Sequence, residues 1–344
     1  MTNAGGRTAP ARAHGTGAHA HVADRPTGRM AGARAAGLLL GYAADRVLGD
    51  PRRFHPVAGF GTAAAALERR LYADSRARGA VHTSVLVGAA AGIGAAAERA
   101  TEGRPLARAA VTAVATWAVL GGRSLEREAT AVQDLLDEGD LPGARERLRS
   151  LVGRDTSTLD ASQVARAVVE SVAENTSDAV VAPLVWGSAA GVPGLLAHRA
   201  ANTLDAMVGH RNARYERFGW ASARLDDLLN HPGARLSGVL AAGSAPGRAG
   251  EALRAWRDHA ARHPSPNAGV VESAFAGALE VRLGGTNRYG DRTEHRPELG
   301  HGRPAEPRDV PRSTALARRV GTGAAVVAAG AAVALAAARA RHAS

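Results

Sequence analysis

The polar residues best placed for chemistry flank one apolar stretch, residues 179–201. Glu174 and Asp178 precede this stretch and are four residues apart, so on a helix they share one face. Asn202 and Asp205 follow it three residues apart and share a face in the same way. Carboxylate and amide oxygens gathered like this suit a hard cation such as Mg²⁺, which takes few carboxylates and keeps phosphate as a partner ligand. Any one of these residues could instead cap a helix or form an interfacial salt bridge.

Further carboxylates, amides and arginines continue after the apolar stretch. The carboxylates that we predict to bind the cation are Glu174, Asp178, Asp205, Asp226 and Asp227. Arginine can hold phosphate oxygens through two parallel hydrogen bonds, and the predicted phosphate ligands are Arg211 and Arg224. The amides predicted to orient a substrate are Asn175, Asn202 and Asn212. The alternative for Arg224 is that it pairs with Asp226 or Asp227 and fixes the loop.

Composition narrows the classes of partner. The chain has 344 residues and a net charge of +11, and all 43 of its basic residues are arginine. Aromatic residues make up only 3%, and the arginines are spread along the chain instead of forming one stripe, which argues against nucleic acid as a partner. Arginines that border apolar runs are typical of anchors at a lipid bilayer. The chain has no cysteine, which excludes a disulfide framework, a thiolate nucleophile and a cysteine-ligated metal.

The apolar runs predict an all-α, multi-pass helical membrane protein with a cytoplasmic-side helical hairpin and polar active-site loops. Mean hydropathy is only −0.14 because long polar segments dilute these runs. The predicted organisation is a disordered tail (1–29), a helical membrane catalytic domain (30–291), a flexible loop (292–312) and a C-terminal transmembrane helix (319–338). Within the catalytic domain, apolar residues at helical spacing predict a hairpin outside the bilayer over 123–152.

A capping box is predicted just after this hairpin. Asp160 and Gln163 have the spacing at which each side chain satisfies the backbone of the other. The helix that they begin would bring Glu174 to the site.

Four stretches of the chain resemble the adenosylcobinamide-phosphate synthase family of cobalamin biosynthesis, in the same order. They are GYAADRVLGDPRRFHPVAGFG, SVAENTSDAVVAPL, ANTLDAMVGHRNARYERFGWASARLDDLLN and AFAGALEVRLGGTNRYG. The resemblance covers roughly residues 38 to 289. Members of that family are multi-pass membrane proteins. They join the carboxylate of adenosylcobyric acid to (R)-1-amino-2-propanol, or to its O-phosphate, through an amide bond. The chain departs from the family pattern at Val270 and Val271, where an aromatic–proline pair is expected.

The resemblance implies an ATP-dependent acid–amine ligase in the cell membrane, with Mg²⁺ as cofactor and ATP as co-substrate. Its partners would be the corrinoid acid, the aminopropanol unit, the lipid bilayer and other late membrane enzymes of the cobalamin pathway. The resemblance also covers the positions of His55, Asn267 and Glu272. We predict that Asn267 binds substrate and that His55 or Glu272 is the base for the attacking amine. The predicted catalytic carboxylates are Glu174, Asp178 and Asp205. His55 could instead only hydrogen-bond within its turn. The chain has no G-x-x-x-x-G-K-[ST] loop, so ATP is not expected to bind in the Walker manner.

Two other classes of function fit the same residues. An intramembrane phospho- or prenyl-transferase would use acidic residues for a diphosphate and would need an apolar tunnel for a lipid tail. A membrane transporter or scaffold would pair the acidic residues with arginines and need a continuous pathway. Turnover of a corrinoid acid with aminopropanol phosphate and ATP separates these three classes.

Overall fold

Helices account for most of the computed structural model, which describes residues 25–50, 56–210, 212–289 and 292–343. The helices in chain order are α1 (Arg25–Leu48), α2 (Pro56–Leu71), α3 (Arg76–Ala100), α4 (Pro105–Val119), α5 (Gly122–Asp137), α6 (Leu141–Leu148), α7 (Ala161–Thr176), a π turn (Ser177–Val181), α8 (Ala182–Val208), α9 (Trp220–Gly243), α10 (Ala249–His259), a 3₁₀ turn (Ala260–Arg262), α11 (Ala268–Leu279) and α12 (Asp309–Ala343). His55 and Arg211 lie outside the described residues, as does most of the predicted tail.

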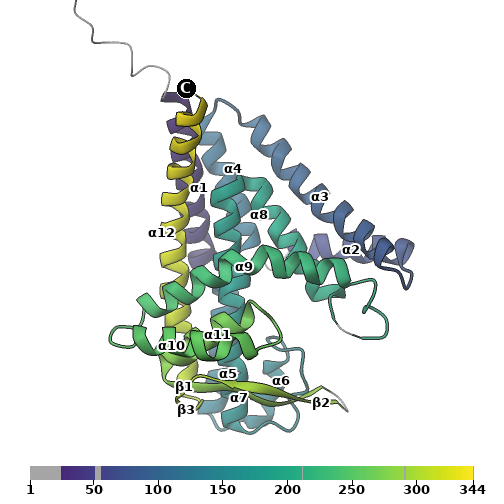
Figure 1. Ribbon diagram of the computed structural model, residues 1–344, viewed down its shortest axis with the longest axis vertical. Helices are drawn as coiled ribbons and strands as arrows, with labels where there is room; N and C mark the ends of the chain where they lie inside the picture. Colours follow the sequence, from purple (N-terminus) through teal and green to yellow (C-terminus); the bar gives the residue numbers. More distant parts are fainter. Residues whose placement is uncertain (1–24, 51–55, 211, 290–291, 344) are drawn as a thin grey trace, which may run out of the picture.

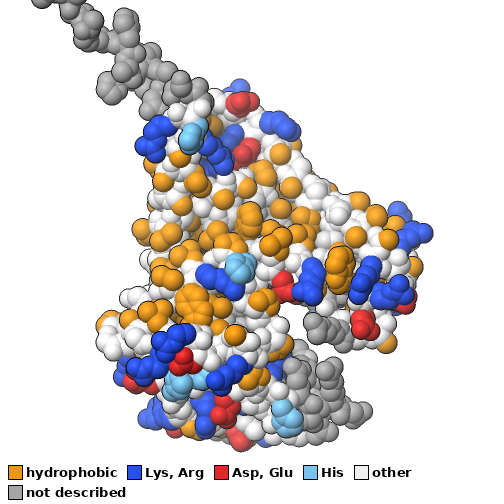
Figure 2. Space-filling view, viewed as in Figure 1, with side chains coloured by type: hydrophobic (Ala, Val, Ile, Leu, Met, Phe, Trp, Pro, Cys, Tyr) orange, Lys and Arg blue, Asp and Glu red, His pale blue; other side chains and the backbone are white. Residues whose placement is uncertain are grey.

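Long apolar helices form one layer of the molecule. Four helical stretches within the described ranges are long and apolar enough to cross a membrane: Arg76–Ala100, Pro105–Asp137, Ala161–Val208 and Asp309–His342. Figure 2 shows a band with few charged side chains between two regions where blue and red side chains gather. The protein is an all-α, multi-pass membrane protein, as the apolar runs predicted.

Small residues let α1, α4 and α12 pack closely at one side of this layer (Figure 1). Cβ atoms added at Gly37 and Gly41 of α1 would lie only 2.5 and 2.4 Å from the Cβ atoms of Thr112 and Thr116 in α4. Close approach through small residues is how helices gain contact in lipid, where apolar burial alone gives little.

The helix α8 doubles back on itself at Gly191. That residue has φ 68° and ψ −148°, a conformation that favours glycine. A Cβ added at Gly194 would lie 2.4 Å from the carbonyl oxygen of Trp186, so the chain on either side of the turn is in contact. The backbone N–H of Val192 donates to Glu98 Oε1 at 3.2 Å, which ties the turn to the end of α3. The apolar stretch 179–201 is therefore a helical hairpin.

A polar lobe, formed by α5, α6, α10, α11 and a small sheet, lies at one end of the long helices (Figure 1). The helical hairpin predicted over 123–152 is present as α5 and α6. The predicted capping box is confirmed, since Gln163 N donates to Asp160 Oδ1 at 2.8 Å and Asp160 N donates to Gln163 Oε1 at 2.9 Å.

The segment 292–312, predicted as a flexible loop, is ordered and includes two strands and the start of α12. The sheet contains β1 (Val281–Tyr289), β2 (Arg292–Leu299) and β3 (Arg303–Pro304), in the order β2-β1-β3. Its first two strands are antiparallel and its third pairs parallel to β1. The prediction was wrong because RTEHRPEL has no apolar alternation and contains a proline. The segment is ordered because its backbone pairs with β1, and its side-chain pattern gives no sign of that pairing.

Two helix starts also differ from the prediction. α1 begins at Arg25, within the predicted tail 1–29, and α12 begins at Asp309, ten residues before the predicted start at 319. Asp309 accepts hydrogen bonds from Arg303 Nη1 at 2.7 Å and from Glu306 N at 2.9 Å, which fixes the first turn of α12. The first turns of α1 and α12 contain charged residues, so hydropathy indicated only the apolar part of each helix.

Candidate active site

The π turn between α7 and α8 carries one of the predicted carboxylates. Asp178 lies within this turn, and Glu174 lies one turn earlier at the end of α7. π turns inside α-helices widen the backbone locally and occur often at functional sites. The charge of Glu174 acts on Asp178, four residues further along the chain.

The turn at Gly191 brings the two ends of the apolar stretch together. Asp178 precedes Gly191 by nearly the same number of residues as Asp205 follows it. Both carboxylates therefore lie at the open end of the hairpin, away from the turn. The charge of Asp205 acts on Asp178 and on Asp226 of α9, and the charge of Asp227 acts on Asp205. Four of the five predicted cation ligands are therefore neighbours across three helical segments, and Glu174 adjoins them.

Asp226 is held by two amides in the middle of this cluster. Asn202 Nδ2 donates to Asp226 Oδ1 at 3.3 Å, and Asn230 Nδ2 donates to Asp226 Oδ2 at 2.9 Å. His198 Nε2 lies 2.8 Å from Asn230 Oδ1, and because that oxygen only accepts, the proton must be on Nε2. His198, Asn202 and Asn230 thereby fix both oxygens of one buried carboxylate.

Burial and the neighbouring charge of Asp205 raise the pKa of Asp226 from its ordinary 3.8 to about 7. The two amide donors act in the opposite direction, because they stabilise the ionised form. The carboxylate therefore changes charge near neutral pH, where a bound cation would favour its ionised form.

A second group of charged residues lies behind Glu174 and joins α7 to the polar lobe. Glu170 accepts from Arg154 Nη2 at 2.7 Å and from Gly284 N at 2.8 Å, so it fixes the start of β1. Buried Glu272 lies 3.8 Å from His263 Nε2. Burial, with the charges of Glu170 and Glu174, raises the pKa of Glu272 well above its ordinary value.

Glu174 connects the two groups and is open to solvent. Its side chain is exposed although protein surrounds it on nearly all sides, so it lines a hollow instead of protruding from the surface. Figure 2 shows the molecule hollowed between the polar lobe and the arm formed by α2, α3 and the start of α9. The charge of Arg296, from β2, acts on both Glu174 and Glu272.

The other predicted ligands lie in differing surroundings. Asn175 Nδ2 donates to the Ser171 carbonyl at 2.9 Å, one turn back along its helix. Asn212 Oδ1 accepts from the N–H groups of Arg214 and Tyr215 at 3.0 and 2.9 Å, so it caps a turn. Asn267 Nδ2 donates to the Asp227 carbonyl at 2.7 Å and thus supports the carboxylates from behind.

Arg224 is exposed and has no hydrogen bond or ion pair with any residue that the structure describes. The alternative in which it pairs with Asp226 or Asp227 therefore has no support from the described contacts. An exposed arginine without a described protein partner is available to a phosphorylated substrate.

Six charged or polar contributors were not predicted: Arg154, Glu170, His198, Arg199, Asn230 and Arg296. Arg199 and His198 interrupt the apolar stretch 179–201, and that interruption was a signal, since charge within a span is usually functional. Arg154 and Arg296 come from segments with no local pattern, and only the fold brings them near the site.

The cluster offers oxygen donors of the kind that Mg²⁺ prefers. Among the described residues, no three His, Asp or Glu side chains converge closely enough to hold a metal ion by themselves. Mg²⁺ commonly binds one or two carboxylates and completes its shell with water and substrate phosphate. Asp178 and Asp205, whose charges face each other and Asp226, fit that kind of site.

Comparison with known proteins places the chain in a family. The family model described as CobD/Cbib protein matches residues 38–317. The chain belongs to the CobD/Cbib family. The range that matches contains every residue of the candidate active site described above. No solved structure matches this family member.

The matches with curated relatives cover most of this chain and most of each relative. The cobalamin biosynthesis protein CobD of Mycobacterium tuberculosis is 54% identical over 298 residues, which are 86% of this chain and 95% of the relative. The cobalamin biosynthesis protein CobD of Geobacter metallireducens is 45% identical over 274 residues, which are 77% of this chain and 86% of the relative. Both names refer to cobalamin biosynthesis.

Proposed function

We propose that this CobD/Cbib family member is an enzyme of cobalamin biosynthesis that forms an amide bond. Its substrates would be adenosylcobyric acid and (R)-1-amino-2-propanol or its O-phosphate, and its product adenosylcobinamide or adenosylcobinamide phosphate. The observation that carries the proposal is the gathering of Asp178, Asp205 and Asp226 by the turn at Gly191, beside a solvent-open Glu174. A buried acidic cluster has no evident structural purpose, because like charges repel when ionised.

The reaction needs an activated carboxylate, since a carboxylate oxygen is a poor leaving group. An oxygen of the corrinoid acid would attack the γ-phosphorus of ATP, giving an acyl phosphate and ADP. The amine nitrogen then attacks the acyl carbon, the C–O bond to phosphate breaks, and inorganic phosphate leaves with that electron pair. The amine nitrogen loses its proton to a base of the protein.

Mg²⁺ at Asp178 and Asp205, when bound, would offset the negative charge of the phosphate oxygens during transfer. Asn202 and Asn230 would keep Asp226 oriented towards the same place. Arg224 would hold the phosphate of the amine substrate, because it is exposed and lacks a described partner.

The proton acceptor is assigned to Glu174, with Glu272 behind it. Glu272 is only 3% exposed, so an amine in the hollow does not reach it directly. Glu174 is exposed in the hollow, and its charge acts on Glu272. His55, the other candidate base, lies outside the described residues and stays a prediction.

The proposed setting is the cell membrane, with the polar lobe facing the cytoplasm that supplies ATP. Other late membrane enzymes of the cobalamin pathway are proposed partners, since the corrinoid product would be their substrate. Arginines at both ends of the long helices do not by themselves decide the orientation.

The test is turnover by the detergent-purified protein. Product from adenosylcobyric acid, aminopropanol phosphate, ATP and Mg²⁺ is measured by mass spectrometry, and ADP release by a coupled assay. Asp205→Asn should lower turnover on the order of 100-fold or more, because it removes a ligand charge while keeping the volume. Glu146→Gln, on the exposed side of α6, is the matched control and should keep full turnover. Amide product without ATP consumption, or full turnover by Asp205→Asn at limiting Mg²⁺, would overturn the proposal.

One observation keeps a prenyl- or phospho-transferase as the second candidate function. That class needs an apolar space for a lipid tail near the acidic residues, and an apolar cavity lies beside Arg199. Incubation with a prenyl diphosphate in place of ATP and the corrinoid tests it. Release of diphosphate would favour the transferase, and no release with intact corrinoid turnover would dismiss it.

A further inference from the structure

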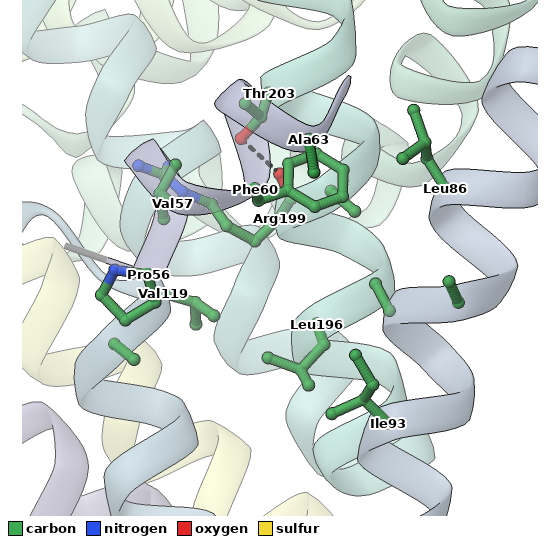
Figure 3. Close-up of a pocket in the computed structure, with 14 residues that line it drawn as sticks. Pro56, Val57, Phe60, Ala63, Leu86, Ile93, Val119, Leu196, Arg199 and Thr203 are labelled. Carbon is green, nitrogen blue, oxygen red and sulfur yellow. Dashed lines mark hydrogen bonds between the residues drawn. The ribbon is translucent and has the colours of Figure 1, made fainter. Parts of the chain in front are cut away.

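An apolar cavity lies among the membrane helices, next to the acidic cluster but outside it. Its volume is about 420 Å³, and side chains of α2, α3, α4 and α8 line it. Figure 3 shows the apolar lining, which includes Phe60, Leu86, Ile93, Val119 and Leu196, and one cationic side chain, Arg199. The volume is towards the lower end of the roughly 300–1,000 Å³ of small-molecule sites, and this size favours a flexible chain over a macrocycle.

The cavity exists because α3 is held at both ends and stands away from its neighbours between them. A Cβ added at Gly79 would lie 1.8 Å from the carbonyl oxygen of Phe218, and one added at Gly94 would lie 2.6 Å from Pro193 N. Both ends of α3 therefore touch other segments directly. Between them, Ala89 and Ile93 remain exposed although they line the cavity, so the space opens towards the surface that faces lipid.

Arg199 is the polar end of this otherwise apolar space. Its buried Nε has no hydrogen-bond partner among the described residues, and its Nη1 reaches only Asn202 Oδ1 at 3.5 Å. In Figure 3 its guanidinium points towards Pro56 and Val57, while Leu196 and Ile93 lie at the far end. Pro56 begins α2, so the positive end of a helix dipole adds to the arginine charge.

The acidic residues near Arg199 do not satisfy all of its hydrogen-bond donors. The charges of Asp50 and Asp178 act on it, but no ion pair joins Arg199 to a carboxylate within the described ranges. A guanidinium has five N–H donors in a fixed fork and binds phosphate oxygens through two of them. The site thus offers a cation with spare donors at one end and an apolar channel at the other.

We propose that the cavity binds one anionic phospholipid from the bilayer, with an acyl chain between α3 and α8 and the phosphate on Arg199. The complementarity is both apolar and electrostatic, and the lateral opening gives lipids direct access from the membrane. The proposal concerns a lipid that is bound and not consumed, and it does not depend on the reaction proposed above.

The experiment is native mass spectrometry of the detergent-purified protein with added dioleoylphosphatidylglycerol. Wild type should retain one lipid per chain after detergent exchange. Ala90→Trp, which fills the cavity from α3, should weaken retention at least about 10-fold by taking up the space of the chain. Val114→Trp adds the same side chain on α4 at a position that is 61% exposed and outside the cavity, and it should retain the lipid as wild type does.

The headgroup is tested separately with dioleoylglycerol, which has the same chains and no phosphate. Wild type should prefer phosphatidylglycerol to dioleoylglycerol, and Arg199→Gln should remove that preference while still binding both. Inorganic phosphate should not compete, since it lacks the chain.

Three results would overturn the proposal. Equal retention by wild type, Ala90→Trp and Val114→Trp would show only an unspecific lipid layer. Loss of corrinoid binding in Ala90→Trp without loss of lipid would assign the cavity to the substrate. If Ala90→Trp fails to fold, Ala89→Leu is the second variant, and undiminished retention by a folded Ala89→Leu would count against the site.

Discussion

Asp226 is both fixed by hydrogen bonds and shifted in its pKa by its surroundings. Both of its carboxylate oxygens accept hydrogen bonds from amides, which favour the ionised form. Burial and the charge of Asp205 oppose ionisation more strongly, so the pKa is raised to about 7. The side chain is held in one orientation whichever form it takes, and a cation would decide which form prevails.

The first prediction is a pH dependence of stability that Asp226 causes. Its pKa is about 7 in the folded protein against an ordinary 3.8, so the folded state binds an extra proton between these values. The stability that this contributes is fully present below about pH 4 and is lost as the pH rises through about 7. Between pH 5 and pH 8 the loss is on the order of 3 kcal/mol. Melting curves in detergent with EDTA should show Tm falling over that range, and Asp226→Asn should flatten the fall.

Two controls accompany this measurement. Asp134→Asn, at an exposed position on α5, should leave the pH profile of wild type unchanged. Added Mg²⁺ should raise Tm more at pH 8 than at pH 5, because it binds the ionised carboxylates. An Asp226→Asn profile as steep as that of wild type would mean that other groups cause the slope.

The second prediction at the residue scale concerns Arg224. Lysine keeps the charge but cannot make the flat, two-pronged contact with phosphate. Arg224→Lys should therefore raise the Michaelis constant or lower turnover for aminopropanol phosphate, and leave unphosphorylated aminopropanol unaffected. Because Arg224 is exposed and has no described partner, stability should change by no more than about 0.5 kcal/mol. Equal losses on both substrates with a lower Tm would show that Arg224 fixes its loop.

At the scale of elements, the turn at Gly191 assembles the site. It converts a stretch of helix into a hairpin, and only then do Asp178 and Asp205 become neighbours. The turn is supported from outside by Glu98, which pairs with Arg34 at 3.4 Å and Arg108 at 3.3 Å as well as accepting from Val192 N. The far end of the hairpin thus controls the geometry of the carboxylates.

The third prediction follows from this turn. Gly191→Ala places a Cβ in a positive-φ conformation, and that atom would lie 2.2 Å from Glu98 Oε1. Backbone strain and displacement of Glu98 together should cost about 2–4 kcal/mol and lower turnover as well. Gly88→Ala in α3 is the control, since a Cβ there meets no atom within 4 Å, and it should be neutral or slightly stabilising. If thermal melting shows Gly191→Ala to be as stable as Gly88→Ala, the turn is not under the strain described.

The sequence allowed parts of this arrangement to be predicted, for physical reasons. The spacings of Glu174 with Asp178 and of Asn202 with Asp205 are local, so the shared faces followed from helix geometry alone. The fold-back was not predicted, although Gly191 and Pro193 interrupt the apolar run and are a turn signal. Hydropathy records the apolar character of this stretch but not the direction of the chain, so it does not indicate the fold-back.

The contacts made by the sheet were beyond prediction for a different reason. The strand β2 is polar and contains a proline, so its order depends on its pairing with β1. Arg166 in turn holds β1, because its Nη2 donates to the Thr286 carbonyl at 3.1 Å. Arg296 reaches the site only because that pairing exists. Such tertiary contacts join residues far apart in sequence and leave no local pattern.

For the whole molecule, the distribution of charge defines two ends separated by an apolar band (Figure 2). The polar lobe and the candidate active site share one end, whereas the α3–α4 connection and the end of α12 share the other (Figure 1). The proposed ATP-dependent reaction would require the lobe to face the cytoplasm. The connection between α3 and α4 must then face the opposite side.

The last prediction tests this orientation. Because the chain has no cysteine, a single introduced cysteine is the only thiol of the protein that a maleimide can label. Glu138→Cys lies in the turn between α5 and α6, and Glu102→Cys lies between α3 and α4. A membrane-impermeant maleimide should label Glu102→Cys in intact cells and Glu138→Cys only after permeabilisation. Labelling of both from the same side would contradict the multi-pass arrangement. The reversed pattern would keep that arrangement but put the acidic cluster away from cytoplasmic ATP, and the proposed ligase reaction would then fail.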